Sequence, residues 1–165
     1  MSVALIVGFT EKAGSHLYNS AAVYFEGRVI GKYRKLRPAI NRSIYTAGTE
    51  LPVFEVKGLR FGMQICNDSN FPEQTASLAA SGARVLFVPS NNALPVAKAD
   101  VVQLTREVDT SLALHNSIYV VRADVAGSLD GFTAYGTSEI VDPTGKRLAQ
   151  AAKLMPTLIH SDIAH

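Results

Sequence analysis

The chain has 165 residues, of which 47% are hydrophobic, and it carries a net charge of +2 at neutral pH. This length and composition suffice for one hydrophobic core, so we expect a single domain over residues 1–165. The charges are interspersed and no basic run alternates with aromatic residues, which argues against a nucleic-acid partner. With one cysteine there is no internal disulfide, and the N-terminal stretch has no charged leader and is too short to span a bilayer. We therefore expect a cytoplasmic protein without a membrane partner.

The first part of the chain predicts strands and hairpins. The apolar or alternating stretches lie at residues 3–9, 20–25, 28–33, 53–56 and 59–65. Gly27 and Gly58 can adopt the positive φ that tight hairpin turns require. The run 3–9 is continuously apolar, which predicts a strand buried on both faces.

The second part mixes helices with strands. Pro72 is suited to the first turn of a helix over residues 72–81, and Asp100 is a candidate N-cap for a helix that continues to about His115. Further strands are predicted at residues 84–88, 118–122, 137–141, 146–149 and 157–162. Hairpins combined with strand–helix–strand units indicate an α/β protein with a mixed sheet.

Cys66 lies where the predicted strand 59–65 runs toward the helix that Pro72 opens. Backbone N–H groups of Asn67 and Asp68 would be free at such a junction, and free N–H groups at a helix start stabilise an anion or a thiolate. The alternative is that Cys66 is a small buried apolar residue, as most single cysteines are.

A cysteine nucleophile needs a base and donors for the oxyanion that it creates. Lys35 ends a strand, as Cys66 does, and its ammonium group would stabilise both a thiolate and an oxyanion. A lysine and arginine cluster after a strand can equally be a solvated sheet edge. The histidines show neither a cysteine–histidine pattern nor ligand spacing with Cys66, so we expect no metal site. These histidines are His16, His115, His160 and His165.

Several ordered motifs resemble those of the nitrilase or carbon–nitrogen hydrolase superfamily. The motifs are residues 18–35, Gly48, residues 61–68 with 71–73, residues 88–90, residues 136–138 and residues 141–145. The Cys66-Asn67-Asp68 form is more similar to the amidase and carbamoyl-amino-acid hydrolase branches than to the nitrile-hydrolysing branch.

The resemblance implies a nitrilase-like αββα sandwich with mixed sheets that hydrolyses carbon–nitrogen bonds through a glutamate–lysine–cysteine triad. Cys66 matches the nucleophile, and Lys35 and the backbone N–H of Asn67 match the oxyanion donors. The family uses no metal or organic cofactor. Asn41, which stands where the family usually has a second glutamate that positions the lysine, and Asn91, at a polar strand end, are candidate substrate-binding residues.

The resemblance also implies that the family's base glutamate lies in a segment that precedes residue 1. We therefore expect the chain to represent the C-terminal two-thirds of the usual domain and to expose apolar surface. That surface would be covered by self-association into a homo-oligomer or by a chain that supplies the missing segment. Two functions stay open: hydrolysis of an amide or N-carbamoyl substrate through a thioester, with doubtful activity for this chain alone, or a non-catalytic binding or assembly module derived from that fold.

Overall fold

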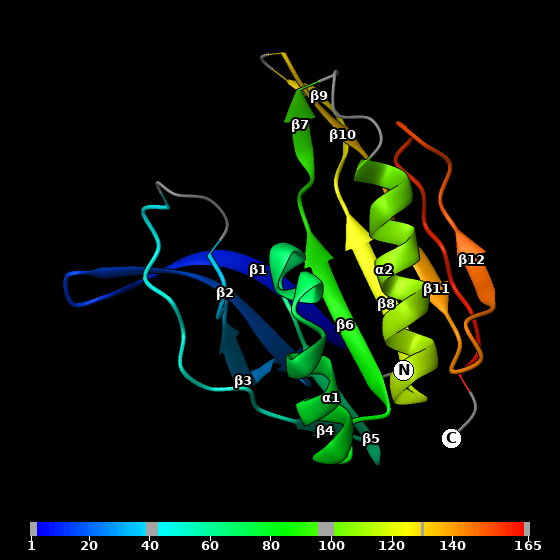
Figure 1. Cartoon of the computed structure of the whole chain (residues 1–165). Helices are drawn as coiled ribbons and strands as arrows, with labels where there is room; N and C mark the ends of the chain where they lie inside the picture. The colour runs from blue at the N-terminus through cyan, green and yellow to red at the C-terminus, as the bar shows by residue number, and fades with distance from the viewer. Residues whose placement is uncertain (1–2, 39–42, 96–100, 130, 164–165) are drawn as a thin grey trace.

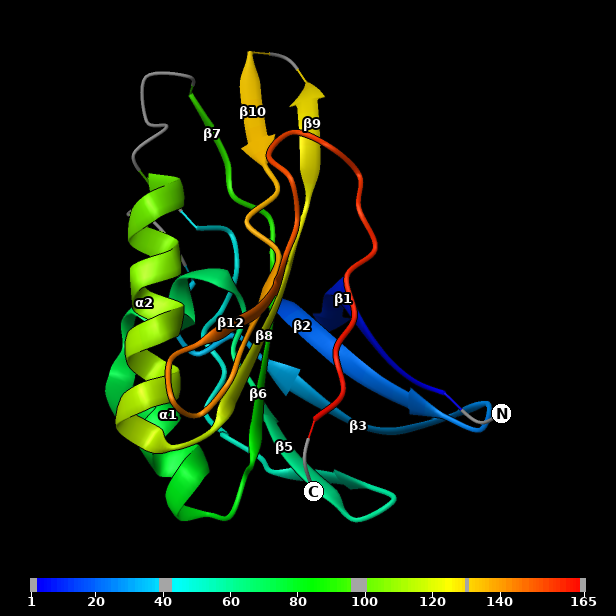
Figure 2. The same ribbon diagram turned by 90° about the vertical axis from the view of Figure 1, so that its right-hand side faces the viewer.

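Three layers stack on one another in the computed structural model, which describes residues 3–38, 43–95, 101–129 and 131–163 (Figures 1 and 2). A three-stranded antiparallel sheet has the order β1-β2-β3 and packs on one face of a six-stranded sheet. Two helices, α1 and α2, cover the opposite face of the six-stranded sheet. The bounds are β1 Ala4–Ala13, β2 His16–Phe25, β3 Arg28–Arg34, α1 Pro72–Ala80 and α2 Val101–Asn116.

The six-stranded sheet is mixed, as the sequence predicts. Its order is β12-β11-β8-β6-β5-β4, in which β5, β6 and β8 run parallel and the other neighbours run antiparallel. Its strands are β4 Phe54–Val56, β5 Leu59–Met63, β6 Val85–Ser90, β8 Tyr119–Asp124, β11 Glu139–Val141 and β12 Arg147–Gln150. A short 3-10 helix, η1, covers Cys66–Asn70, and a small third sheet joins β7 Ala93–Pro95, β10 Phe132–Tyr135 and β9 Ala126–Leu129.

Strand β6 is buried on both faces, because it lies between two hydrophobic cores. Leu86 and Val88 belong to the core between the six-stranded sheet and the helices. Val85 belongs to the core between the two larger sheets, and Phe87 packs against it. Since successive side chains of a strand point to opposite faces, this alternation builds both cores from one short apolar run.

Both predicted hairpin turns are confirmed. Glu26 and Gly27 have φ values of 49° and 75°, and Lys57 and Gly58 have φ values of 51° and 81°. Two consecutive positive φ values match the twist of the flanking strands. The predicted helices and most predicted strands also form within a few residues of their expected bounds, although Asp100 lies outside the described residues.

Two predictions about strands are wrong. The stretch 3–9 is not buried on both faces: β1 is an edge strand of its sheet, and most of its residues are exposed. Residues 157–162 form no strand, since this segment pairs with no described neighbour. The sequence reading also missed β7, β9 and β10, which are only three or four residues long.

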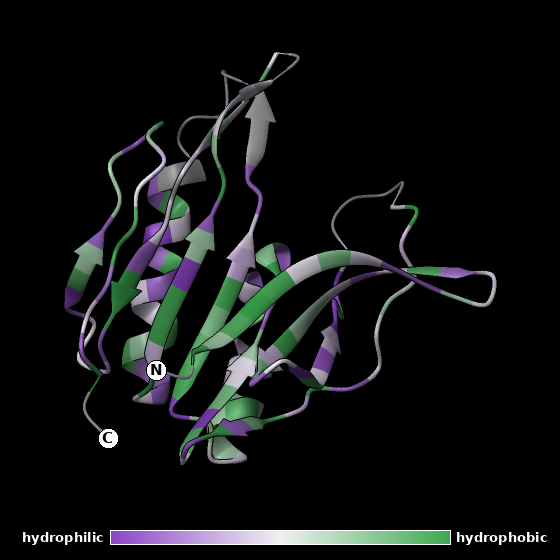
Figure 3. Ribbon diagram, turned by 180° about the vertical axis from the view of Figure 1, so that it is seen from behind, coloured by the Kyte–Doolittle hydropathy of each residue, from purple (hydrophilic) through white to green (hydrophobic). Residues whose placement is uncertain are grey.

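The outer face of the β1–β2–β3 sheet carries a strip of exposed apolar side chains. Figure 3 shows hydrophobic segments along the ribbon of this sheet. The exposed residues include Leu5, Val7, Phe9, Tyr24 and Val29. Among the described residues both helices lie on the other side of the molecule, so the described layers are helix, sheet and sheet, without a second helical layer (Figure 2). No described helix is long and apolar enough to cross a membrane.

Candidate functional site

Three polar residues gather at the carboxyl ends of adjacent parallel strands. Cys66 follows β5, Asn92 follows β6 and Asp124 ends β8. The register pairs Met63 with Phe87 and Ser90 with Asp124, so the three strand ends lie side by side. Ligands in open α/β sheets bind at this kind of edge, because the strands end there and leave a crevice.

Cys66 adopts a left-handed backbone conformation, with φ at 49°. Such a conformation is unfavourable for residues other than glycine and persists only when its surroundings enforce it. Here η1 begins at Cys66, and Ser69 Oγ donates a 2.9 Å hydrogen bond to the carbonyl oxygen of Cys66. The Asp68 N–H donates to the carbonyl oxygen of Ile65 at 3.1 Å, so the prediction that this N–H is free is wrong.

Asp68 joins the Cys66 turn to the segment that carries Lys35. Its buried carboxylate accepts hydrogen bonds from Tyr33 Oη at 2.7 Å and from the backbone N–H of Arg37 at 2.7 Å. Burial, together with the charge of Asp68 and this hydrogen bond, raises the pKa of Tyr33 above its ordinary value. Lys35 lies between these two anchored positions and is 5% exposed. The structure therefore brings the two motif segments together, and the solvated-edge alternative for Lys35 is wrong.

Paired residues on the helix-facing side of the six-stranded sheet change from apolar to polar toward the site. Leu86, Val120 and Val141 form an apolar row across three strands. The next row consists of Val88, Arg122 and Glu139, and the row at the strand ends pairs Ser90 with Asp124. The core therefore ends in a buried charge layer just before the site.

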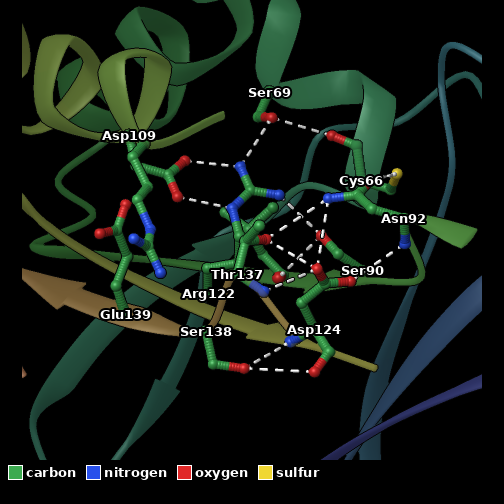
Figure 4. Close-up of polar contacts among 12 residues, drawn as sticks. Cys66, Ser69, Ser90, Asn92, Asp109, Arg122, Asp124, Thr137, Ser138 and Glu139 are labelled. Carbon is green, nitrogen blue, oxygen red and sulfur yellow. Dashed lines mark hydrogen bonds and ion pairs between the residues drawn. The ribbon is translucent and has the colours of Figure 1, made fainter. Parts of the chain in front are cut away.

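Arg122 is the hub of that layer (Figure 4). Its side chain is 1% exposed and binds the fully buried carboxylate of Asp109 through two hydrogen bonds of 2.5 Å. It also donates to Ser90 Oγ at 2.7 Å and to Ser69 Oγ at 3.0 Å, so it connects the β6 end to the Cys66 turn. Burial opposes the charge of Arg122, yet the charge of Asp109 and its hydrogen bonds raise the pKa of the guanidinium above its ordinary value.

Glu139 is a second buried carboxyl group in this layer. It forms an ion pair with Arg147, with 2.5 Å between Nε and Oε2. Burial and the nearby charge of Asp109 raise the pKa of Glu139 to about 7, although Arg147 and Arg106 act in the opposite direction. Glu139 therefore holds its proton more tightly than an exposed glutamate does.

Asn92 contacts the sulfur of Cys66 directly. The Cys66 thiol donates to Asn92 Oδ1 across 3.1 Å. Asp124 holds Asn92 from the other side, since it accepts from the Asn92 backbone N–H at 3.0 Å and from Nδ2 at 3.4 Å. Thr137 Oγ1 also accepts from Nδ2 at 3.4 Å, while Thr137 donates to Asp124 through its hydroxyl at 2.7 Å and its backbone N–H at 2.9 Å.

The other predicted site residues lie at different distances from this centre. Asn67 follows Cys66 within η1, and its side chain donates to the carbonyl oxygen of Arg37 at 3.2 Å. Asn91 is exposed and lines a cavity of about 410 Å³ with Val125 and Phe132. Asn41 lies outside the described residues. The roles assigned to these residues stay predictions.

Sequence reasoning missed Asn92, Arg122 and Asp109. A signal for Arg122 was available, because a charged residue at the end of the apolar run from Ile118 to Val121 needs a buried partner. For Asn92 the sequence showed only two adjacent asparagines at a strand end, and nothing distinguished the exposed one from the one that reaches the sulfur. Among the described residues no group of three or more histidine, cysteine or acidic side chains could hold a metal ion.

Comparison with known proteins confirms the family resemblance. Residues 1–164 match the model of the family described as carbon-nitrogen hydrolase. The chain is 34% identical over 154 residues to a nitrilase of Pyrococcus abyssi, and the aligned region covers 92% of this chain and 55% of that protein. It is 30% identical over 154 residues to an (R)-stereoselective amidase of Pseudomonas, with 92% of this chain and 54% of that protein covered.

A solved structure agrees with these relatives. Saccharomyces cerevisiae Nit3, a member of branch 10 of the nitrilase superfamily, matches with a TM-score of 0.80 and 28% identity, over 90% of this chain and 55% of Nit3. The chain thus spans about half the length of the curated relatives it matches. Because a family model covers nearly all of the sequence and relatives above 30% identity cover most of it, the chain belongs to the carbon–nitrogen hydrolase family.

Proposed function

We propose that the chain carries the nucleophilic half of a hydrolase that acts on small amides or N-carbamoyl compounds through a thioester on Cys66. The observation that carries this proposal is the left-handed Cys66 at the end of β5, held by Ser69 and Arg122 beside the anchored Lys35 segment. A structural cysteine needs no strained backbone, whereas a nucleophile that must protrude from a strand end does. The names of the relatives, a nitrilase and an amidase, fit a carbon–nitrogen bond as the target.

In the proposed reaction the sulfur of Cys66 attacks the carbonyl carbon, and a carbon–sulfur bond forms while the carbonyl electrons move to oxygen. The thiol proton passes through a general base to the nitrogen. The carbon–nitrogen bond then breaks, the carbonyl re-forms, and ammonia or an amine leaves with that proton. Water attacks the resulting thioester, which gives a carboxylic or carbamic acid and restores the thiol.

Lys35 and the backbone N–H of Asn67 are the proposed oxyanion donors. An ammonium group in a desolvated position stabilises developing negative charge more strongly than it would in water. The Asn67 N–H lies one residue before the Asp68 N–H, which is the one that donates to the Ile65 carbonyl at the start of η1. Both proposed donors stabilise the tetrahedral intermediate more strongly than the bound substrate, so their main effect on hydrolysis is on kcat.

The resemblance identifies no residue of this chain as the general base of the proposed mechanism. None of the glutamates in the sequence lies in a motif that matches the family's base. We therefore expect this chain alone to form a covalent adduct at Cys66 slowly, with proton transfer to the leaving nitrogen through solvent. Steady-state turnover should be small, because water needs a base to attack the thioester efficiently.

The test is an incubation with a panel of small amides and N-carbamoyl amino acids, followed by intact-mass analysis and an ammonia assay. We expect up to one acyl or carbamoyl group per chain, located on Cys66, and none in the Cys66→Ala variant. Adducts on other residues, or a measurable release of ammonia or amine that is equal in wild type and Cys66→Ala, would exclude the proposal. Absence of any adduct in a folded chain would favour the non-catalytic binding or assembly module.

A further inference from the structure

The orientation of the Asn92 amide is fixed by the groups around it. Its Nδ2 faces a carboxylate oxygen of Asp124 and the hydroxyl oxygen of Thr137. A carboxylate only accepts hydrogen bonds, and the Thr137 hydroxyl already donates its proton to that same carboxylate at 2.7 Å. Both neighbours therefore require a donor, and rotation of the amide by half a turn would place Oδ1 against a carboxylate. Oδ1 must face Cys66.

The sulfur therefore has a fixed acceptor beside it. Oδ1 lies 3.1 Å from Sγ, and the Asn92 backbone is itself held by Asp124 at 3.0 Å. An acceptor in this position favours a ligand that offers a proton near the attacked carbon. It disfavours a ligand that offers an oxygen lone pair there, because two acceptors would face each other without a proton between them.

We propose that Asn92, oriented by Asp124 and Thr137, is a specificity residue that accepts a hydrogen bond from the N–H of the group attacked by Cys66. This inference rests on the proposed function and narrows it to amides and ureido compounds that carry at least one hydrogen on nitrogen. When Sγ bonds to the carbonyl carbon, the substrate nitrogen lies two bonds from Sγ, within reach of an oxygen 3.1 Å from that sulfur. Esters and N,N-dialkyl amides offer no such hydrogen and lose the interaction.

The second role in this arrangement belongs to Asp124, which acts as a positioning residue. It contacts Asn92 and Thr137 rather than the sulfur, and its own backbone N–H binds Ser138 Oγ at 2.9 Å. In Asp124→Asn a side-chain amide replaces an acceptor-only group. The Asn92 amide can then rotate and present its NH2 to the sulfur, so the preference for N–H donors should fall even though Asn92 is still present.

The experiment compares two alkylating agents, chloroacetamide and N,N-dimethylchloroacetamide, whose amide nitrogen carries two hydrogens or two methyl groups. Cys66 attacks their chloromethyl carbon, so the amide nitrogen lies three bonds from Sγ, one bond further than in an attacked amide. Their labelling rates at Cys66 are measured by intact mass, and the ratio of the two rates is divided by the same ratio for free N-acetylcysteine. A single hydrogen bond between neutral groups should give a ratio of about three to ten in the wild type. The ratio should fall to about one in Asn92→Leu and to an intermediate value in Asp124→Asn.

Asn116→Leu provides a matched control, because it makes the same chemical change far from the site. Asn116 ends α2 just before β8 begins, whereas Asp124 lies at the other end of β8. Circular dichroism checks that each variant is folded, and Asn92→Ser replaces Asn92→Leu if the latter is not. A wild-type ratio near one would overturn the proposal. A high ratio that persists in both Asn92 variants would also overturn it, since shape rather than hydrogen bonding would then exclude the methyl groups.

Failure of this inference and failure of the proposed function are distinguishable. Labelling by chloroacetamides needs only a nucleophilic sulfur, whereas thioester formation from an unactivated amide also needs the oxyanion donors and proton transfer to the leaving nitrogen. A raised rate ratio without any amide-derived adduct would support the role of Asn92 and count against catalysis. Amide-derived adducts with a ratio of one would do the reverse.

Discussion

Removal of the Asp109 carboxylate should destabilise the fold strongly, because it leaves the charge of Arg122 buried and unpaired. Both side chains are almost completely shielded from water, at 0% and 1% exposure. Among the described residues the Arg122 side chain makes four hydrogen bonds, of which two go to Asp109 and two go to neutral hydroxyl groups. Breaking such a pair from one side costs about 3–5 kcal/mol. That is a large part of the roughly 5–15 kcal/mol by which a domain is stable.

Urea unfolding followed by circular dichroism measures this effect in Asp109→Leu. The double variant Asp109→Leu/Arg122→Met removes both charges and should recover most of the loss, because well-packed apolar groups can replace a buried ion pair. As a control, Glu73→Gln breaks a solvent-exposed ion pair with Arg37, separated by 3.8 Å, and should cost less than about 1 kcal/mol. A loss below about 1 kcal/mol in Asp109→Leu, or no recovery in the double variant, would refute this reasoning.

Three further predictions concern other parts of the chain. Lys35→Met keeps the bulk of the side chain and removes its charge, so iodoacetamide should label Cys66 more slowly at neutral pH; equal rates would show that Lys35 does not act on the sulfur. The pKa of the Glu139 carboxyl group is raised from 4.5 to about 7, so the folded state binds the carboxyl proton more tightly than the unfolded chain does. The free energy of unfolding should therefore fall as pH rises from about 4.5 through about 7. Glu139→Gln should flatten this part of the pH profile and raise the free energy of unfolding above neutral pH by about 1–3 kcal/mol in urea titrations, and an unchanged slope would contradict the assignment. Light scattering at tens of micromolar should show self-association through the apolar strip, and the double variant Val7→Lys/Phe9→Lys should associate less. A monodisperse wild-type monomer would count against self-association through that face.

The sequence was sufficient for the features that depend on local chemistry. The Glu26-Gly27 and Lys57-Gly58 turns follow from the need for two positive φ values, and they formed where glycine occupies the second position. The junction of β5 and η1 at Cys66 was also predictable, since an apolar run ends there in polar residues.

The features that could not be predicted depend on contacts between distant segments. The apolar stretch of β1 reads as a doubly buried strand, but its position at a sheet edge depends on which layers lie next to it. Asp109 and Arg122 are 13 residues apart and meet because α2 packs back onto β8. Asn92 reaches Cys66 only because β5 and β6 are parallel neighbours, a pairing that residue spacing alone does not specify.

The two larger sheets differ in how far apart their paired strands lie in the sequence, and this difference affects how the protein folds. The β1–β2–β3 sheet is a meander of consecutive strands, whereas the six-stranded sheet pairs strands that are distant in the sequence. Strands β1, β2 and β3 are joined by short turns, so their pairing closes only small loops and can form early. The order β12-β11-β8-β6-β5-β4 needs closure of much longer loops, and contacts of high sequence separation slow folding. Asp68 links the meander to the large sheet through Tyr33 and Arg37. We expect Cys66 to reach its native reactivity only when these two sheets have docked. The rate at which Cys66 is alkylated during refolding would therefore report when this last step of tertiary structure formation occurs.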